Sequence, residues 1–276
     1  MQLGIFAKTF PSDSPLQAVN AVQKAGFVCT QYNMSCSGLA SMPDEINDAT
    51  ANAIRAASEE TNIPIVAVSA TFNMIHPDVS VRKEGLRKLE VIAANAKAMG
   101  TELLTLCTGT RNPDDQWQGH PDNDSMRAWS DLLLAMESAI KIAETHDVHL
   151  GIEPELDNVV NSCAKATRLI QQLKSDRLKI VLDAANLFEQ ISLAEQKHLV
   201  SQAVESVAEH LVMAHAKDRM ADGSFTTAGK GVLDYAHYLQ ALSDCGFEGP
   251  LVTHGLPAED APRVAKFLRK KLKQLR

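Results

Sequence analysis

One pattern runs along the whole chain: short apolar runs alternate with longer amphipathic segments. The short runs are rich in Val, Ile and Leu and nearly continuous, which is typical of parallel strands covered on both faces. Eight such runs occur, at residues 3–6, 27–32, 63–70, 102–107, 148–153, 178–183, 211–216 and 250–254. The alternation therefore predicts eight strand-helix units in succession.

The segments between the apolar runs carry helix signals. Ser14 and Pro15 fit the N-cap and first position of a helix, and Gly26 follows its end. Gly100 fits the left-handed residue that ends a predicted helix over 79–99. Further helices are predicted over residues 125–146, 163–174, 187–210 and 234–245, and a last one near the C-terminal end.

Eight strand-helix units in 276 residues predict an α/β fold of the closed (β/α)8 TIM barrel type. We expect one domain over residues 1–276, because no Ser/Gly linker or low-complexity tract marks a boundary. A doubly wound open sheet is the alternative. That fold would carry a glycine-rich phosphate turn after its first strand, whereas residues 7–11 read AKTFP.

Composition narrows the class of protein. With 45% hydrophobic residues, 22% charged residues and a net charge of -7, we expect a soluble globular protein that binds neither nucleic acid nor anionic membranes. The N-terminus has no charged leader or long apolar segment, so a cytoplasmic location is expected. The five scattered cysteines favour free thiols. The basic face of the last segment fits a solvated helix better than a nucleic-acid arm.

Ionisable residues stand where the later strands are predicted to end. The fifth, sixth and eighth runs end in Glu153, Asp183 and His254, and His215 stands one residue before the end of the seventh. The C-terminal strand ends of a parallel barrel form its active face, and carboxylates and imidazoles from neighbouring strands can bind one divalent cation there. The cation offsets the cost of burying two carboxylates together. The alternatives are helix capping by Asp183 and a hydrogen-bonded core role for His215.

The motifs around these residues resemble those of the xylose-isomerase-like barrel superfamily, and the likeness covers nearly the whole chain. They read IEP at 152–154, LDAAN at 182–186, HAKD at 215–218 and GKGVLD at 229–234. The superfamily contains sugar isomerases and epimerases, inosose dehydratase and apurinic-site endonucleases. The resemblance therefore implies a metal-dependent enzyme of carbohydrate metabolism.

The resemblance also implies a ligand set. The family's sugar isomerases and epimerases hold one divalent metal with Glu, Asp, His and a second Glu, and the two glutamates act as acid and base. Glu153, Asp183 and His215 match the first three ligands, and His254 takes the position of the second glutamate. Imidazole can ligate a metal and exchange protons near neutral pH. Glu153 and His254 are therefore the expected catalytic residues, with Mn, Mg, Co or Zn as cofactor.

The implied reaction is isomerisation or epimerisation of a sugar, sugar phosphate or sugar acid through an enediolate. A metal-dependent dehydratase of the polyol or inosose type and a non-catalytic sugar-binding barrel are alternatives, because the second glutamate is replaced. The resemblance disfavours an abasic-site endonuclease, since Asn186 stands where that branch carries a zinc-binding histidine. The expected partner is a small sugar, and homo-oligomeric assembly is left open.

Polar residues near the same strand ends are candidates for substrate binding. The long loop after the fourth strand is typical of an active-site lid. In it, Trp117 is predicted to stack on a sugar, or else to fold its own loop. Lys217 and Arg219 are candidates for anchoring a phosphate or acid group. Asp218 would orient His215 or pair with a neighbouring cation. The remaining predicted substrate contacts are Asn73, His76, Arg111, His120, Glu155 and Asn186.

Overall fold

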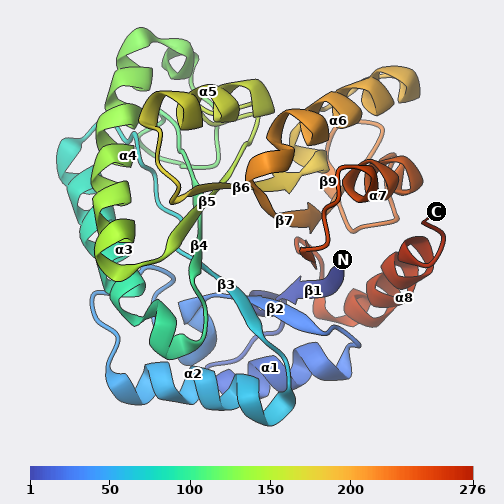
Figure 1. The fold of residues 1–276 in the computed structure, drawn as a ribbon, viewed down its shortest axis with the longest axis horizontal. Coiled ribbons are helices and arrows are strands. Elements are labelled where there is room, and N and C mark those ends of the chain that lie inside the picture. Colours follow the sequence, from blue (N-terminus) through green and yellow to red (C-terminus); the bar gives the residue numbers. More distant parts are fainter. Residues whose placement is uncertain (276) are drawn as a thin grey trace.

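A computed structural model describes residues 1–275 and confirms the closed parallel barrel (Figure 1). The ring runs in chain order from β1 to β7 and then to β10, which pairs with β1 and closes it. The ring strands are β1 (Gln2–Phe6), β2 (Cys29–Tyr32), β3 (Ile65–Ser69), β4 (Leu103–Cys107), β5 (His149–Glu153), β6 (Leu178–Asp183), β7 (Leu211–Ala216) and β10 (Pro250–Thr253). The open-sheet alternative is thereby excluded.

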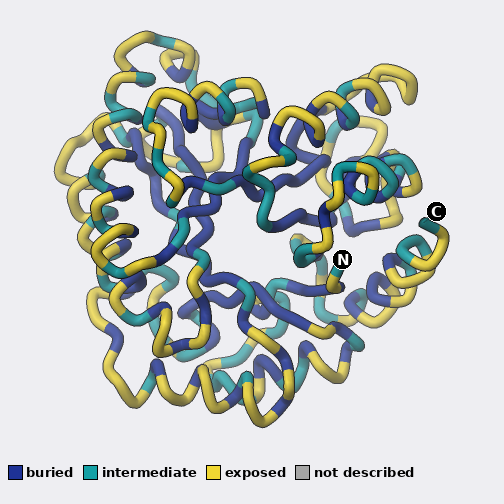
Figure 2. Tube along the Cα trace, viewed as in Figure 1, coloured by how far each residue is buried: buried dark blue, intermediate teal, exposed yellow. Residues whose placement is uncertain are grey.

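An α-helix follows each strand of the ring, and the helices surround the strands (Figure 1). They are α1 (Pro15–Lys24), α2 (Asp48–Thr61), α3 (Val79–Met99), α4 (Met126–His146), α5 (Cys163–Leu173), α6 (Leu193–Val207), α7 (Tyr235–Asp244) and α8 (Ala261–Leu272). Figure 2 shows the strands buried at the centre and the outer faces of the helices exposed. No helix within residues 1–275 combines the length and apolar character needed to cross a bilayer.

Three local features differ from the sequence-based expectations. Helix α2 lies in a segment for which no helix bounds were predicted, and Asn47 caps it by accepting a hydrogen bond from the Thr50 N–H. The helix predicted over 187–210 begins only at α6, because Ser192 and Glu195 form a capping box there. A small antiparallel hairpin, β8 (Asp218–Arg219) and β9 (Phe225–Thr226), follows β7 and was not predicted.

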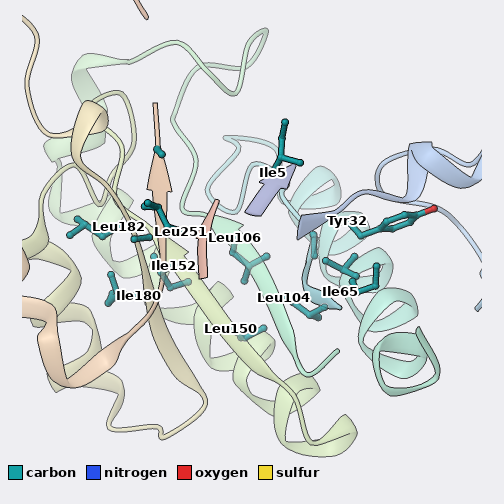
Figure 3. Close-up of a cluster of buried hydrophobic side chains, with 14 of the residues drawn as sticks. Ile5, Tyr32, Ile65, Leu104, Leu106, Leu150, Ile152, Ile180, Leu182 and Leu251 are labelled. Atoms are coloured by element: carbon teal, nitrogen blue, oxygen red, sulfur yellow. The ribbon is translucent and has the colours of Figure 1, made fainter. Parts of the chain in front are cut away.

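The outward-facing side chains of the strands join the main hydrophobic core. Alternate residues of β4, β5 and β6 carry Leu or Ile, and these side chains are almost fully buried (Figure 3). They are Leu104, Leu106, Leu150, Ile152, Ile180 and Leu182. Since successive residues of a strand point to opposite faces, the intervening residues of the same strands face the barrel interior.

The barrel interior contains a separate small cluster, the inner apolar layer, formed by Ala67, Val181, Met213 and Val252. All four residues are fully buried. Gly151 leaves room for this layer, because a Cβ atom there would lie 2.8 Å from Cγ2 of Val181. The inner apolar layer therefore closes the barrel below the C-terminal strand ends and supports whatever side chains lie there.

Candidate metal and substrate site

Strand periodicity places the ionisable residues directly above the inner apolar layer. Asp183 follows Val181 by two positions on β6, and His215 follows Met213 by two positions on β7. Residues two positions apart on a strand share a face, so both side chains point into the barrel. The structure thus brings together the four residues predicted as metal ligands, although His254 lies one residue beyond the end of β10.

Each of the four, which we call the ligand cluster (Glu153, Asp183, His215 and His254), offers one ligand atom. These atoms all lie within 4.8 Å of one another. Glu153, Asp183 and His215 are buried, and His254 is partly buried. Two carboxylates and two imidazoles form a donor set that Mn²⁺, Co²⁺ and Zn²⁺ accept, so the residues fit a divalent cation.

Each carboxylate of the ligand cluster is paired with one imidazole. Nδ1 of His215 lies 3.1 Å from Oε1 of Glu153, and Nε2 of His254 lies 3.0 Å from Oδ2 of Asp183. The two imidazole rings are close neighbours, with centroids 4.5 Å apart. Asp183 also accepts a hydrogen bond of 2.9 Å from the Ala185 N–H. It therefore caps the short 3₁₀ helix η4 (Ala184–Asn186) and also lies in the ligand cluster.

The electrostatic environment separates the protonation preferences of these groups. Burial raises the pKa of Asp183, but the hydrogen bond and charge of His254 outweigh burial and lower that pKa to about 2. Burial and the positive charge of His215 lower the pKa of His254, which favours the neutral imidazole. Burial lowers the pKa of His215, but the charge of Glu153 and its hydrogen bond raise it by more. Asp183 is therefore ionised and accepts the hydrogen bond from His254.

Two neutral side chains complete the hydrogen bonds of the ligand cluster. Asn186 donates from Nδ2 to Oε1 of Glu153 at 2.9 Å, so it contacts a predicted ligand as well as lining the cavity. Gln31 of β2 lies on the other side, with its Oε1 2.9 Å from Nε2 of His215. Sequence reasoning missed Gln31. Its only signal was a polar residue inside an otherwise apolar strand, in the run at 27–32.

Glu155 lies beside the ligand cluster, past Pro154. Its Oε1 accepts a hydrogen bond of 3.0 Å from the Cys107 thiol, and the side chain lines the cavity. Burial and the negative charge of Glu153 raise the pKa of Glu155 to about 7. Burial also raises the pKa of the Cys107 thiol, which stays protonated as the donor. Glu155 is thus a second carboxyl group that faces the substrate space.

The two cations after β7 differ in how they are engaged. Arg219 is buried and donates to the Ala185 carbonyl at 2.6 Å and to the Gly223 carbonyl. Its guanidinium is therefore engaged mainly in hydrogen bonds to loop backbone. Lys217 lines the cavity, with its Nζ 3.2 Å from the centroid of the Phe225 ring. Arg219 also contacts that ring, at 3.9 Å. Lys217 is therefore the more available cation for a substrate.

Asp218 has a structural role that differs from the predicted ones. Its carboxylate accepts hydrogen bonds from the backbone N–H groups of Arg219, Gly229, Gly231 and Leu233, at 2.9 to 3.1 Å. A Cβ atom on Gly231 would lie 2.3 Å from Oδ1 of Asp218, so this approach requires glycine. Asp218 organises the segment that carries the β8–β9 hairpin, and its hydrogen bonds go to the backbone of that segment.

Four of the predicted substrate contacts lie outside the main cavity in the structure. Asn73 accepts hydrogen bonds from the backbone of Ile75 and Thr110, which holds the loop after β4. His76 uses Nε2 on the Pro113 carbonyl and Nδ1 on the Asp78 N–H. Both nitrogens of that imidazole are therefore engaged in loop structure, and neither is left for a sugar.

The other two residues outside the main cavity are Arg111 and His120. Arg111 is buried and pairs with Asp131 of α4, and it donates to the Ile75 carbonyl at 3.2 Å. His120 accepts from the Asp122 N–H and caps a short 3₁₀ helix, η3 (Pro121–Asp124). Arg111 is therefore directed by distant partners and His120 by its own loop, and strand periodicity predicts neither arrangement.

A cavity of about 470 Å³ lies above the ligand cluster. Predicted residues that line it are Trp117, Glu155, Asn186, Lys217 and Arg219, together with Glu153, His215 and His254 of the ligand cluster. Trp117 is 52% exposed, so it does not hold its loop together as a buried core residue. The rest of the wall consists largely of uncharged polar side chains: Gln31, Asn33, Ser41, Ser69, Thr71, Thr105 and Gln116.

Solved structures similar to this chain include several sugar-converting enzymes. The 3-keto-D-glucoside 4-epimerase YcjR from E. coli is 17% identical, with a TM-score of 0.77 over 98% of this chain and 99% of the other. D-psicose 3-epimerase from Clostridium cellulolyticum H10 is 17% identical, with a TM-score of 0.76 over 99% of both chains. At such identities, the likeness establishes the fold.

A dehydratase is also among the similar structures. The probable 3-DHS dehydratase AsbF from Bacillus anthracis is 14% identical, with a TM-score of 0.75 over 99% of both chains. No curated protein sequence matches the chain. The model of the family described as xylose isomerase-like TIM barrel matches residues 19–273. The chain therefore belongs to the xylose isomerase-like TIM barrel family.

Proposed function

We propose that this protein is a divalent-metal-dependent epimerase or isomerase of an unphosphorylated sugar. The observation that carries the proposal is the ligand cluster, whose four ligand atoms lie within 4.8 Å of one another at the base of a polar cavity. Glu153, Asp183, His215 and His254 would hold the metal. A divalent cation at this place supplies Lewis-acid polarisation of a substrate carbonyl.

The residues around the ligand cluster support proton transfer at carbon. Epimerisation or isomerisation of a sugar requires removal of a proton next to a carbonyl and its return to the same or a neighbouring carbon. Glu153 and His254 come from strands separated by β6 and β7, so they approach a substrate in the cavity from two directions. Glu155 adds a third proton-accepting group beside Glu153. In this proposal, Glu153 or Glu155 and His254 exchange the proton.

The cavity wall favours a neutral substrate over a sugar phosphate. Most of its polar side chains are amides and hydroxyls, which can pair with sugar hydroxyls as donors or acceptors. Arg219, the residue best suited to a bidentate phosphate contact, is engaged with two backbone carbonyls. Glu155 and Asp157 line the same cavity and would repel a phosphate dianion. Lys217 is then free to donate to a carbonyl or hydroxyl oxygen.

The test is solvent exchange. We expect the metal-loaded protein, incubated in deuterated water with a panel of ketoses, aldoses and keto-glycosides, to incorporate deuterium next to the carbonyl of its substrate. A phosphorylated counterpart of that substrate is expected to react more slowly. Absence of exchange for all neutral sugars in protein that holds metal would contradict the proposal.

A dehydratase is the second candidate, and the replacement of the family's second glutamate by His254 favours it. Dehydration needs one base for the carbon-bound proton and one acid for the leaving hydroxyl, and a carboxylate with an imidazole can fill these roles. The same incubations separate the two candidates, because a dehydratase forms an enone or enol product with loss of water, whereas an epimerase conserves the mass of its substrate.

A further inference from the structure

Gln31 occupies an unusual position for a neutral side chain. Gln31 is 3% exposed and comes from β2. It contacts His215 on β7 across the barrel interior, although β2 and β7 are not paired in the sheet. The Oε1 atom of Gln31 lies 2.9 Å from Nε2 of His215. On its other side, Nε2 of Gln31 donates to Oγ1 of Thr105 at 3.0 Å. The amide is therefore held between β4 and β7.

We infer that Gln31 is a positioning residue that accepts the Nε2 proton of His215 and thereby turns the unprotonated Nδ1 of that imidazole toward the ligand cluster. This inference rests on the proposed metal site. A neutral imidazole carries one proton and one lone pair, so a hydrogen bond at one nitrogen decides which nitrogen can bind a cation. Metal-binding histidines commonly donate their other N–H to an outer acceptor, which fixes the tautomer and the ring plane.

The contacts of the neighbouring groups agree with this assignment. Nδ1 faces Glu153 at 3.1 Å, where it can donate to that carboxylate when no metal is bound. A cation among the ligand atoms would displace this proton, and the Nδ1 lone pair would then lie on the side of the other ligand atoms. The hydrogen bond to Thr105 occupies the amide nitrogen of Gln31 and leaves its oxygen for His215. The backbone of β7 is held as well, because Tyr238 donates to the His215 carbonyl at 3.2 Å. The ring therefore has a fixed position and a defined acceptor.

The competing arrangement reverses the amide. Thr105 would then donate to Gln31, and the amide nitrogen of Gln31 would donate to Nε2 of His215. The imidazole would carry its proton on Nδ1, directed at Glu153, and would have no lone pair for a metal on that side. The two arrangements make opposite demands on residue 31: one needs an acceptor there, and the other needs a donor.

The variants Gln31→Glu and Gln31→Leu separate these demands. A carboxylate is an acceptor only, and leucine is neither acceptor nor donor. We expect the dissociation constant for Co²⁺ or Zn²⁺, measured by titration of metal-free protein, to rise about 10- to 100-fold in Gln31→Leu. In Gln31→Glu it is expected to equal or fall below the parent value. Equal weakening in both variants would overturn the inference, because an acceptor at residue 31 would then not preserve metal binding. Tighter metal binding in Gln31→Leu would overturn it in favour of the reversed amide, whose donor holds the proton on Nδ1.

The matched control is Gln196→Leu. Gln196 is also buried, at 2% exposure, bridges the Val232 carbonyl and the Asp234 N–H, and does not line the main cavity. The Gln196→Leu variant removes an equally buried amide, and we expect its metal affinity to equal that of the parent protein. Melting of each metal-free variant shows whether it is folded. A Gln31→Leu affinity within twofold of the parent would show that Gln31 only fills the interior, and would also overturn the inference.

A measurement on the parent protein needs no variant. With ¹⁵N-labelled histidine and Zn²⁺, we expect the His215 resonances to show a protonated Nε2 and a Zn²⁺-coordinated Nδ1. A proton on Nδ1 would overturn the inference while leaving the proposed reaction intact. If the parent binds no divalent metal at all, the proposed function fails with it, so the two failures are distinguishable.

Discussion

The two halves of the barrel differ at their C-terminal strand ends. The half formed by β5, β6, β7 and β10 places the four ionisable residues of the ligand cluster there; we call it the ionisable half. The strands β1 to β4 present Phe6, Gln31, Ser69, Thr105 and Cys107 to the same cavity; we call these strands the uncharged half, although Lys8 lines the cavity from the short helix that follows β1. Both halves are built from the same strand-helix unit. The difference therefore arises in the side chains of a single layer.

This asymmetry has an energetic reason. Two carboxylates and two imidazoles held within 4.8 Å are costly without a compensating cation, and one cation can compensate only groups that reach it. Amides and hydroxyls in the uncharged half need no compensating ion, because they can pair with one another, as the Gln31 to Thr105 contact of 3.0 Å illustrates. Charge is thus concentrated where one ion can serve it, and neutral groups remain for substrate hydroxyls.

The variant expected to have the largest effect on the difference between the two halves is Asp183→Asn, in the ionisable half. The isosteric amide can still accept from the Ala185 N–H, so we expect a folded protein. We expect metal affinity to fall by about 100-fold or more, beyond the loss for an outer partner, and substrate exchange to disappear. Titration with Mn²⁺ or Co²⁺ measures the metal affinity. Asp157→Asn, which also lines the cavity, is the control; equal loss in both variants would show that charge alone matters.

His254→Gln tests whether metal binding and proton transfer depend on different residues of the ionisable half. Glutamine can donate to Asp183 but cannot exchange a proton near neutral pH, so we expect turnover to fall by about 10²- to 10⁴-fold. Metal affinity is expected to fall less than in Asp183→Asn. Deuterium exchange and metal titration on the same preparation provide both values. Normal exchange in His254→Gln would assign the proton transfer to Glu153 and Glu155 alone.

Gly151→Ala probes the layer that both halves share. The added Cβ would lie 2.8 Å from Cγ2 of Val181 and 3.3 Å from Cδ1 of Leu103, so the inner apolar layer must shift. We expect the free energy of unfolding to fall by about 1–3 kcal/mol, as for overpacked cores. Denaturant unfolding of the metal-free protein measures this. Unchanged stability would mean that the layer adapts freely and does not fix the ligand cluster.

Trp117→Ala, in the loop that follows a strand of the uncharged half, is expected to have the smallest effect. Its half-exposed ring can stack on a sugar, a contact that contributes about 0.5–1.5 kcal/mol. We expect KM to rise about 2- to 10-fold with kcat nearly unchanged. Steady-state kinetics checks this, with Trp129→Phe on α4 as a control away from the cavity. A fall in kcat alone would indicate that the loop acts during chemistry.

The fold could be predicted because each strand is buried on both faces and therefore has a nearly continuous apolar sequence. The convergence of Asp183 and His215 followed from the same periodicity, since strand ends in a closed ring meet at one face. The bounds of helix α2 were not predicted because its buried face has only one large apolar residue. The buried residues are Ala51, Ile54, Ala57 and Thr61. Small residues give little hydrophobic signal.

The loop residues could not be placed in the same way. Arg111 was expected in the substrate space but turns to Asp131 of α4, a partner 20 positions away that no local pattern reveals. Gln31 was missed for the opposite reason: a single amide in a strand carries no charge or motif, and its role appears only when β2 and β7 are seen around one ring. Whether the ligand cluster binds metal stays a prediction.

The carboxylate of Asp218 gathers the backbone at both ends of the segment from Arg219 to Leu233. The two ends of the segment are therefore held together by one side chain, and its tip, residues 220–228, includes β9 and carries Phe225 to the cavity. Such a module invites loop grafting. Exchanging only the tip, residues 220–228, while keeping Asp218 and Gly231, offers a route to new substrate preferences on an unaltered barrel.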